Sequence, residues 1–284
     1  MTRSMPIRYK HPLRIAVLIL VTSVFVGVPG IHGRVWRVCM ACDDGDVQTL
    51  GEALLKAEPR DTILVVWEPS FPYAIESIVI NKPVRIISHP AAGDITDYDL
   101  FPVLTSTRSP IVRITVPGVE LIGFNVMYLE KPAVPDDDAE YAGRVGIHLE
   151  APALIRYCAV TNCSAAVVAA YSHPPSSATG SRIEHCRIGI PGDHGLDREN
   201  MKHSLNLYGL VLLGHPGWTD GCDRITGNQI MRNRRTGVVY TPQNKPCMSD
   251  NLVELNGDGP FRIARRQPNS EDRLHWIIES QATP

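Results

Sequence analysis

A short apolar frame recurs along the chain and constrains its fold more than any other feature. In each copy an apolar residue is followed three positions later by Phe, Cys or Asn, and two positions further by a second apolar residue. The copies are residues 121–126, 155–160, 183–188, 225–230 and 248–253. Where no insertion intervenes, another apolar strand follows eight residues later, as from Val160 to Val168. Short β-rich segments repeating at roughly 23–30 residues, with no helical pattern between them, predict an all-β parallel solenoid.

The position that Phe, Cys or Asn occupies in the frame has a physical meaning in such a fold. Its occupants would stack ~4.8 Å apart along the solenoid axis, one coil above the next. An Asn at this turn can hydrogen-bond the amide of the neighbouring coil, while Cys and Phe fill the same column by packing. The predicted column consists of Phe124, Cys158, Cys186, Asn228 and Asn251. We interpret it as structural; the alternative is a cysteine–asparagine active site.

The two ends of the predicted β-helix, residues 46–265, show different patterns. Residues 46–58 place Val47, Leu50, Leu54 and Ala57 on one face at helical spacing, with Asp46 as N-cap and Pro59 ending the helix. This helix would cap the first strands, expected at 62–66, 77–80 and 84–88. Residues 266–284 are predicted to be a C-terminal cap, with a helix starting at 269–272 and an apolar patch at 274 and 276–278.

Residues 1–30 have the pattern of an export signal. Arg8, Lys10 and Arg14 precede an apolar run of 14 residues, 15–28, whereas a membrane-spanning helix needs roughly 20. A cleaved signal peptide therefore fits best and predicts a secreted, periplasmic or secretory-pathway protein. The alternatives are an uncleaved anchor, which would be the protein's membrane contact, and a buried segment.

Residues 31–45 form a predicted linker that contains the motif Cys39-Met40-Ala41-Cys42. A second cysteine pair at zinc-finger spacing is absent from the sequence, and the acidic Asp43 and Asp44 follow. A local disulfide or two unreacted thiols are thus expected in place of a metal or redox site. The chain has seven cysteines, so in an exported protein at least one would stay unpaired or bridge to another molecule.

Composition excludes several classes of protein. With 44% hydrophobic and 20% charged residues, the chain is neither disordered nor a multi-span membrane protein. The net charge of −2 conceals a basic start, because residues 31–284 carry 24 basic against 30 acidic residues. This acidic remainder lacks the basic surface that nucleic-acid binding requires.

Two segments carry a resemblance to a known superfamily. Residues 46–66 resemble the capping helix and first strands of pectin-lyase-like right-handed parallel β-helix proteins, and residues 225–239 resemble their coil repeat. The resemblance covers about residues 44–265 and implies the fold. The superfamily includes polysaccharide lyases, glycoside hydrolases, pectin methylesterases, uronan epimerases and the β-helix part of F-box proteins, so the fold does not select a function. The catalytic motifs that these enzymes share are not matched: Pro191-Gly192-Asp193-His194 only approximates the epimerase signature.

Two long insertions interrupt the frame at the same turn, residues 127–146 and 189–210. Insertions at equivalent turns of a solenoid line one face, where ligands commonly bind. We predict catalytic roles for Asp193, His194, Asp197 and His203, and substrate contacts for Asp136 and Asp138. Paired carboxylates beside His suit acid–base cleavage of a sugar chain, or would hold Ca²⁺, the one cofactor considered. The alternative is that these are ordinary solvated loops.

A second constellation follows the other turn. His173-Pro174 and His215-Pro216 occur at nearly matching offsets in neighbouring coils, and Trp218 and Asp220 continue the second loop. Here we predict substrate contacts for His173, His215, Trp218 and Asp220, because an exposed Trp stacks on a sugar face. The alternative is exposed His-Pro turns with Trp218 packed on the solenoid wall. A metal site is not predicted.

Two functional hypotheses follow. The first is an exported β-helix protein that binds, and as an enzyme would cleave, a polysaccharide, either as a lyase or as a glycoside hydrolase. The second is a non-enzymatic module that binds a protein ligand, similar to the β-helix region of F-box-type adaptors. The second rests on Cys158 and Cys186, which look like reduced core residues of a cytosolic protein.

Overall fold

The computed structural model describes residues 33–39, 45–66, 77–89, 98, 101–128, 143–176, 178–189, 206–215, 217–218, 221–266 and 276–279. Contacts divide the chain into residues 1–32, which lie outside the described part, and a second unit from Gly33 onward. Among the described residues, no helix is long and apolar enough to span a membrane. The predicted export signal therefore stays a prediction.

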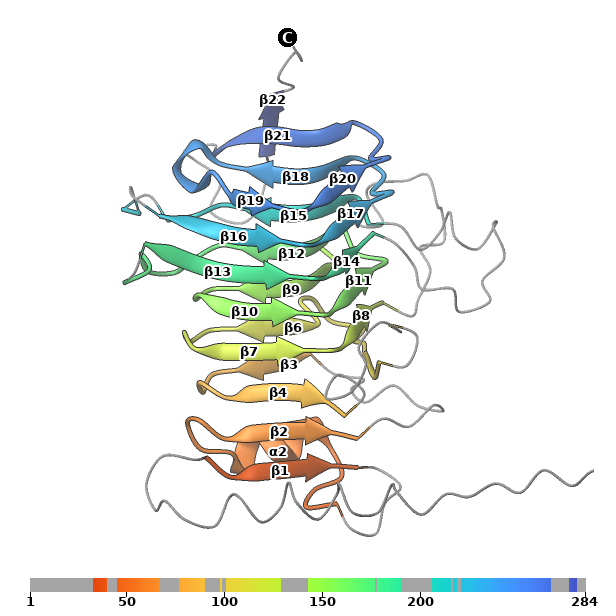
Figure 1. Cartoon of the computed structure of the whole chain (residues 1–284), viewed down its shortest axis with the longest axis vertical. Helices are drawn as coiled ribbons and strands as arrows, with labels where there is room; N and C mark the ends of the chain where they lie inside the picture. The colour runs from red at the N-terminus through yellow and green to blue at the C-terminus, as the bar shows by residue number, and fades with distance from the viewer. Residues whose placement is uncertain are drawn as a thin grey trace, which may run out of the picture. The chain divides into compact units, whose positions relative to one another are not determined.

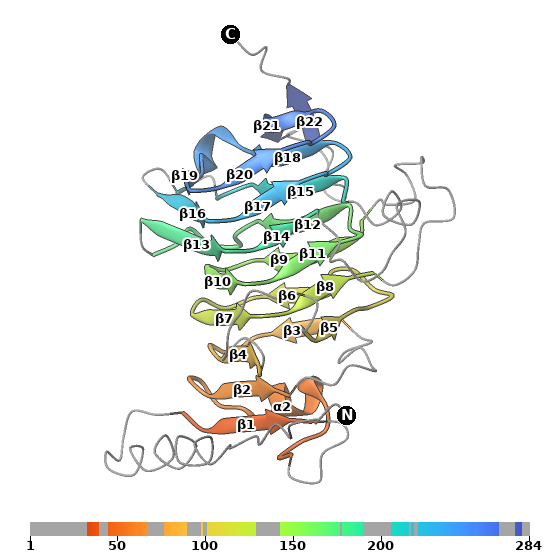
Figure 2. The same cartoon turned by 45° about the vertical axis from the view of Figure 1, so that its right-hand side comes forward.

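The second unit is a stack of coils wound through three sheets (Figures 1 and 2). Sheet A contains β1 (Val35–Val38), β2 (Thr62–Val65), β4 (Arg85–Ser88), β7 (Val119–Ile122), β10 (Ala153–Arg156), β13 (Thr179–Glu184), β16 (Cys222–Thr226) and β19 (Cys247–Ser249). Sheet B contains β5 (Val103–Leu104), β8 (Asn125–Met127), β11 (Ala159–Thr161), β14 (Arg187–Ile188), β17 (Gln229–Met231) and β20 (Leu252–Glu254). From β4 onward the chain visits sheets A, B and C in turn.

Sheet C completes each coil. It contains β3 (Ile78–Ile80), β6 (Val112–Ile114), β9 (Val145–Leu149), β12 (Ala165–Ala169), β15 (Tyr208–Leu212), β18 (Thr236–Tyr240), β21 (Gly259–Arg266) and β22 (Trp276–Glu279). Neighbouring strands are parallel in all three sheets except for the antiparallel pair β21–β22. The predicted solenoid and its three early strands are confirmed.

The core is built from the apolar positions of the frame. Ile155, Ile183 and Ile225 follow one another in register through β10, β13 and β16, and all three are fully buried. Each coil thereby stacks an apolar side chain on the equivalent one of the next coil. Because successive strand residues point to opposite faces, the intervening positions face outward and are free to be polar.

The predicted column exists at the turn from sheet A to sheet B. Its members directly precede Asn125, Ala159, Arg187, Gln229 and Leu252, which pair in register. The Oδ1 atom of Asn228 accepts from the Cys186 N–H at 2.7 Å, and the Oδ1 atom of Asn251 accepts from the Asn228 N–H at 2.9 Å. Cys158 and Cys186 are buried free thiols. The column is therefore structural.

A second ladder, which the sequence analysis missed, lies at the turn from sheet B to sheet C. Cys163 donates its N–H to Asn206 Oδ1 at 3.0 Å, and Asn233 donates its N–H to Asn256 Oδ1 at 3.0 Å. The Nδ2 group of Asn206 joins them by donating to Asn233 Oδ1 at 3.3 Å. Its signal is present in the sequence, because Cys163, Asn233 and Asn256 each follow a member of the first column by five residues.

The N-terminal helix is shorter than predicted. α2 covers Leu50–Lys56, with Thr49 as N-cap accepting from the Glu52 N–H at 3.1 Å. The predicted start at Asp46 was wrong, because Val47 forms a parallel β-bridge with Val38. The Asp46 carboxylate instead accepts from the Arg37 N–H at 2.8 Å. Buried Leu50 and Ala53 place the apolar face of the helix against the core, as a cap requires.

The C-terminal segment also differs from the prediction. Trp276–Glu279 is a strand that pairs with the end of β21 and not part of a helix. The expected helix start at 269–272 lies outside the described residues. Pairing with β21 occupies the edge of sheet C, so the backbone of β21 is better satisfied by a strand than by a helix.

Disulfides occur at both ends of the solenoid. Cys222 of β16 and Cys247 of β19 are bonded, and their Cα atoms lie 5.7 Å apart. Cys39 of the CxxC motif is also disulfide-bonded, which removes the idle-thiol alternative for this residue. The described free cysteines are Cys158, Cys163 and Cys186, all buried.

Asp61 links the capping elements, and its charge should matter at low pH. Its carboxylate accepts from the Arg34 N–H at 2.7 Å, the Trp36 indole at 2.9 Å and the Glu58 N–H at 2.9 Å. Burial raises the pKa of Asp61, but these donors outweigh burial and hold the pKa below its ordinary value of 3.8. A lowered pKa contributes stability that is present above this value and lost as the pH falls through the folded-state pKa.

We therefore expect Asp61→Asn to lower the free energy of unfolding by about 1–2 kcal/mol at pH 7 and by less near pH 3. Urea denaturation at both pH values measures the change. Asp250→Asn, at an exposed turn, is the control with little effect at either pH. An equal loss for Asp61→Asn at both pH values would contradict the charge-based explanation.

Candidate functional site

Both long insertions lead from sheet B into the N-terminal end of a strand of sheet C. The first joins β8 to β9 and the second joins β14 to β15, so each leaves sheet B and enters sheet C. Between them, the connection from β11 to β12 consists of only three residues, 162–164. The predicted residues of these loops, Asp136, Asp138, Asp193, His194, Asp197 and His203, lie outside the described residues. Their roles stay a prediction, but both insertions do interrupt the same turn.

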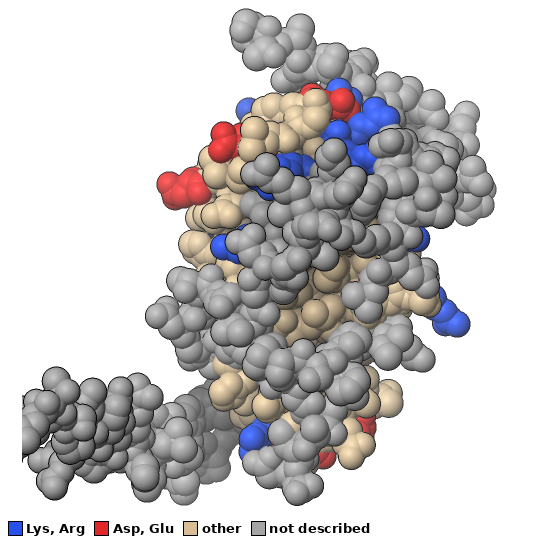
Figure 3. Space-filling view, turned by 90° about the vertical axis from the view of Figure 1, so that its right-hand side faces the viewer, with Lys and Arg blue, Asp and Glu red and all other residues tan. Residues whose placement is uncertain are grey.

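Basic side chains gather near the C-terminal end of this side of the solenoid (Figure 3). The turn from β17 to β18 contributes Arg232, Arg234 and Arg235. Asp258 of the next coil pairs with Arg235 at 3.6 Å and with Arg262 at 3.4 Å. The pair with Arg235 joins two coils and the pair with Arg262 lies within one, and we assign both a structural role.

The outward face of sheet C carries one column that changes character along the solenoid. In register, the column runs Val79, Arg113, His148, Val168, Val211, Val239, Arg262. Arg113 and His148 lie between apolar neighbours, Val79 on one side and Val168 on the other. Arg113 and His148 thus interrupt an apolar stripe on sheet C, the sheet that both insertions lead into.

Glu150 completes a cluster with these two residues. Arg113 Nε donates to Glu150 Oε1 at 2.7 Å, and His148 Nδ1 lies 3.7 Å from the same oxygen. The side chains are 46% exposed for Arg113, 28% for His148 and 16% for Glu150. The carboxylate therefore sits beneath two groups that reach solvent and holds both in place.

The electrostatics of the cluster keep His148 neutral near pH 7. Burial lowers the pKa of His148, Glu150 opposes this effect, and Arg113 adds to it, with a net result below the ordinary value of 6.5. The pKa of Arg113 is raised by its hydrogen bond to Glu150. The cluster thus presents a permanent cation beside a neutral imidazole, which can accept a hydrogen bond or take up a proton.

The second predicted constellation is only partly assembled. Trp218 is 5% exposed and packs edge-on against Tyr171, with ring centroids 5.7 Å apart. The alternative for this loop, a Trp218 packed on the solenoid wall, is confirmed, and the predicted sugar contact of an exposed indole is not, because burial leaves no free face for a sugar. His173 is exposed, and His215 Nδ1 accepts from the Gly217 N–H at 3.0 Å. Asp220 lies outside the described residues.

Beneath this turn lies a buried carboxylate that the sequence analysis did not single out. Asp223 is fully buried; its Oδ1 atom accepts from the Ser181 N–H at 2.6 Å and from the Tyr171 hydroxyl. Its Oδ2 atom accepts from Asn244 Nδ2 at 2.7 Å. Burial raises the pKa of Asp223. Because substrate cannot reach it, we interpret this network as structural.

Two further observations concern modification and metal binding. Asn162-Cys163-Ser164 has the pattern of a glycosylation sequon, but Asn162 is 3% exposed and its Nδ2 group donates to the Tyr128 carbonyl, so the folded protein does not present it for modification. Within the described ranges, three or more His, Cys, Asp or Glu side chains do not gather into a group that could hold a metal ion. A Ca²⁺ site in the two insertions stays a prediction.

Comparisons with known proteins support the fold. The sequence matches no known family, and no curated protein is significantly similar to it. Among solved structures, pectate lyase Pel9A superposes with a TM-score of 0.54 at 12% identity, covering 86% of this chain. The protein has the pectin-lyase-like parallel β-helix fold.

The chain spans 57% of the length of pectate lyase Pel9A. At 12% identity the likeness shows the fold alone. Function must therefore be argued from the side chains of this chain.

Proposed function

We propose that this protein is exported and binds an acidic polysaccharide on the outward face of β6 and β9 in sheet C, with Arg113 and His148 as direct contacts. The observation that carries the proposal is the Arg113–His148–Glu150 cluster, on the sheet that both insertions lead into. The likeness to a polysaccharide lyase supports the same class of ligand.

The chemistry of the cluster suits a uronate. The guanidinium of Arg113 offers several donors, and only Nε is engaged by Glu150, so its other N–H groups can bind a carboxylate. His148, held neutral, would pair with a sugar hydroxyl. Val79, which is 48% exposed and lies next to Arg113, would contact the less polar face of a sugar ring.

The disulfides favour export over the adaptor alternative. Cys222–Cys247 and the oxidised Cys39 are typical of an oxidising compartment. The free Cys158 and Cys186, which motivated the adaptor hypothesis, are fully buried. Buried thiols are inert in either compartment, so they do not favour the cytosol.

The proposal predicts a loss of affinity on substitution of the cluster. We expect Arg113→Ala to weaken binding of polygalacturonate by about tenfold, since one charge-assisted contact is worth about 1.4 kcal/mol or more. His148→Ala should weaken it by about three- to fivefold, because a hydrogen bond from a neutral imidazole is worth about 1 kcal/mol. Isothermal titration calorimetry measures the change. A neutral galactan is the comparison ligand and should bind weakly to every variant.

Arg85→Ala is the matched control, because Arg85 is an exposed arginine of sheet A paired with Glu120 at 3.2 Å. It should bind as the parent does. The double variant Asp193→Ala/His194→Ala tests whether the insertions share the site. Parent-like affinity of both cluster variants would overturn the proposal. Loss of viscosity of the polymer over time, abolished by His148→Ala, would extend it from binding to cleavage.

A further inference from the structure

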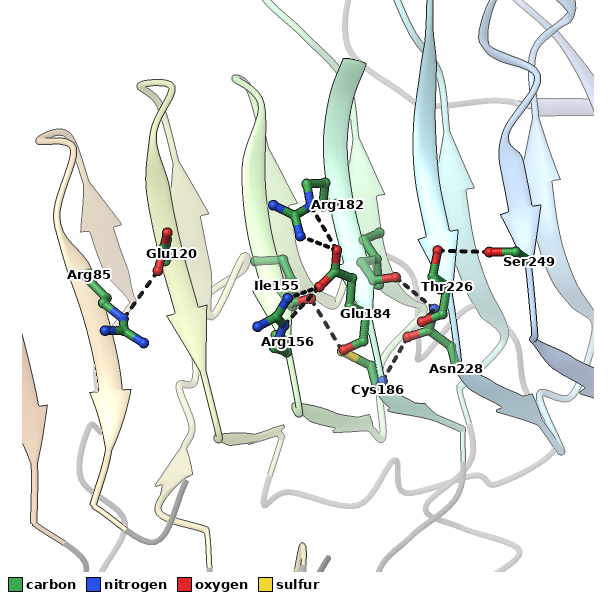
Figure 4. Close-up of polar contacts among 11 residues, drawn as sticks. Arg85, Glu120, Ile155, Arg156, Arg182, Glu184, Cys186, Thr226, Asn228 and Ser249 are labelled. Carbon is green, nitrogen blue, oxygen red and sulfur yellow. Dashed lines mark hydrogen bonds and ion pairs between the residues drawn. The ribbon is translucent and has the colours of Figure 1, made fainter. Parts of the chain in front are cut away.

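We propose a second anion-binding surface, on the outward face of sheet A, that takes carboxylate or sulfate groups of an anionic polysaccharide. It consists of Arg182, Arg224, Thr226 and Ser249, from β13, β16 and β19, and we call it the sheet A patch. Figure 4 shows Arg182, Thr226 and Ser249 projecting from the same face. The patch is distinct from the cluster on sheet C.

The register of sheet A shows why these residues are unusual. Toward the N-terminus, residues that pair in register carry opposite charges: Arg85 pairs with Glu120, and Arg156 with Glu184. Arg182 of β13, by contrast, pairs in register with Arg224 of β16. Like charges directly opposite each other in a sheet are destabilising. Two adjacent arginines lower the stability of a sheet whose other charges pair favourably, and such an exception marks a candidate functional surface.

The charges of this region do not cancel. Glu184 accepts from Arg156 and also from Arg182, whose Nε lies 2.7 Å from Glu184 Oε1. One carboxylate thus serves two guanidinium groups, and the donors hold the pKa of Glu184 below its ordinary value despite burial. Arg224 is exposed and makes no ion pair with any described residue. Three cations therefore face a single anion.

Hydroxyl groups continue the surface next to Arg224. Thr226 and Ser249 pair in register, and their side-chain oxygens lie 3.1 Å apart (Figure 4). The outward positions of β16 and β19 are occupied by Cys222, Arg224, Thr226, Cys247 and Ser249, none of them acidic. Guanidinium and hydroxyl donors on a common face are the groups that bind carboxylate and sulfate oxygens.

A covalent link keeps this surface rigid. Cys247 pairs in register with Arg224, and its disulfide to Cys222 joins the two strands that carry Arg224, Thr226 and Ser249. Side chains on a rigid platform lose less entropy on binding than side chains on a loop. The disulfide thereby favours a preorganised site.

A second surface would strengthen attachment to a polymer. A long anionic chain, or several neighbouring chains, can contact sheets A and C at once, and two linked contacts raise the apparent affinity without new interactions at either site. The inference goes beyond the proposed function, which concerns sheet C alone. The two surfaces can fail independently in experiment.

The test is retention of the full chain on immobilised polygalacturonate and on dextran sulfate, eluted with a NaCl gradient. We expect Arg224→Ala and Arg182→Ala to weaken binding by about five- to tenfold and to elute at lower salt. Arg224→Lys should keep part of the retention, because it keeps the charge. Arg85→Ala, in the same outward column, is the matched control and should elute with the parent.

The outcomes separate this inference from the proposed function. Loss with Arg224→Ala alone supports the sheet A patch, and loss with Arg113→Ala alone leaves only the sheet C site. Parent-like elution of Arg224→Ala on both resins overturns the inference. Thermal melting excludes misfolding of Arg224→Ala, because removal of a like-charge neighbour without an ion pair of its own should leave the melting temperature equal or higher. Preference for one resin identifies carboxylate or sulfate as the group bound.

Discussion

Asn228→Ala is expected to lower the free energy of unfolding by about 3–4 kcal/mol, because it removes the central rung of the first ladder. The side chain accepts from the Cys186 N–H at 2.7 Å and donates to the Ile183 carbonyl at 2.8 Å. Asn228 is 1% exposed, so water cannot replace these partners. Each buried group left without a partner costs about 1–3 kcal/mol.

Urea denaturation of the parent and the variant measures this loss. Asn251→Ala is the matched control one coil further on, where the side chain is only partly buried, so that water can enter the space which the amide leaves. We expect a loss of about 1 kcal/mol there. Equal losses at the two positions would show that the ladder is not what stabilises these turns.

Asp223→Ala should cost about 2–3 kcal/mol, since it leaves the buried Asn244 amide without an acceptor and removes one acceptor from the Ser181 N–H and the Tyr171 hydroxyl, which still bond to each other. Asp223→Asn should cost much less, because it keeps an acceptor for the Ser181 N–H and the Tyr171 hydroxyl. The Oδ1 atom of Asn244, which is buried without a hydrogen bond, becomes available to the new amide if Asn244 turns over.

The pH dependence distinguishes a charge effect from a packing effect. Burial raises the pKa of Asp223 in the folded state, so the folded protein binds the proton more tightly than the unfolded chain. The stability associated with this proton is present below the unfolded-state pKa of about 4 and is lost as the pH rises through the folded-state pKa. Asp223→Asn lacks this loss.

We therefore expect Asp223→Asn to become more stable relative to the parent as the pH rises from 4 to 8. Parallel urea titrations across this range test it. A constant difference would mean that Asp223 titrates alike in both states. Tyr171→Phe is the control, because it removes one donor and leaves the carboxylate in place.

The fold could be predicted from the sequence because its defining pattern is local. The recurring frame places apolar residues such as Ile155, Ile183 and Ile225 at equivalent points of each coil, and a stack of such coils is how they can all be buried. The predicted column of Phe, Cys and Asn residues followed from the same frame. The helix start was misplaced because the β-bridge of Val47 to Val38 depends on a strand outside the helical pattern.

The polar sites depended on the tertiary structure. Arg113 and Glu150 lie 37 residues apart, and Tyr171 and Asp223 lie 52 apart. Which residues meet is set by the register between coils, and insertions of unequal length hide that register in the sequence. The burial of Trp218 was decided in the same way, by Tyr171 of the preceding coil. The repeat by itself determined the solenoid, because coil stacking needs only periodic apolar residues. The tertiary structure decided where charges lie side by side, because that depends on the alignment of different coils.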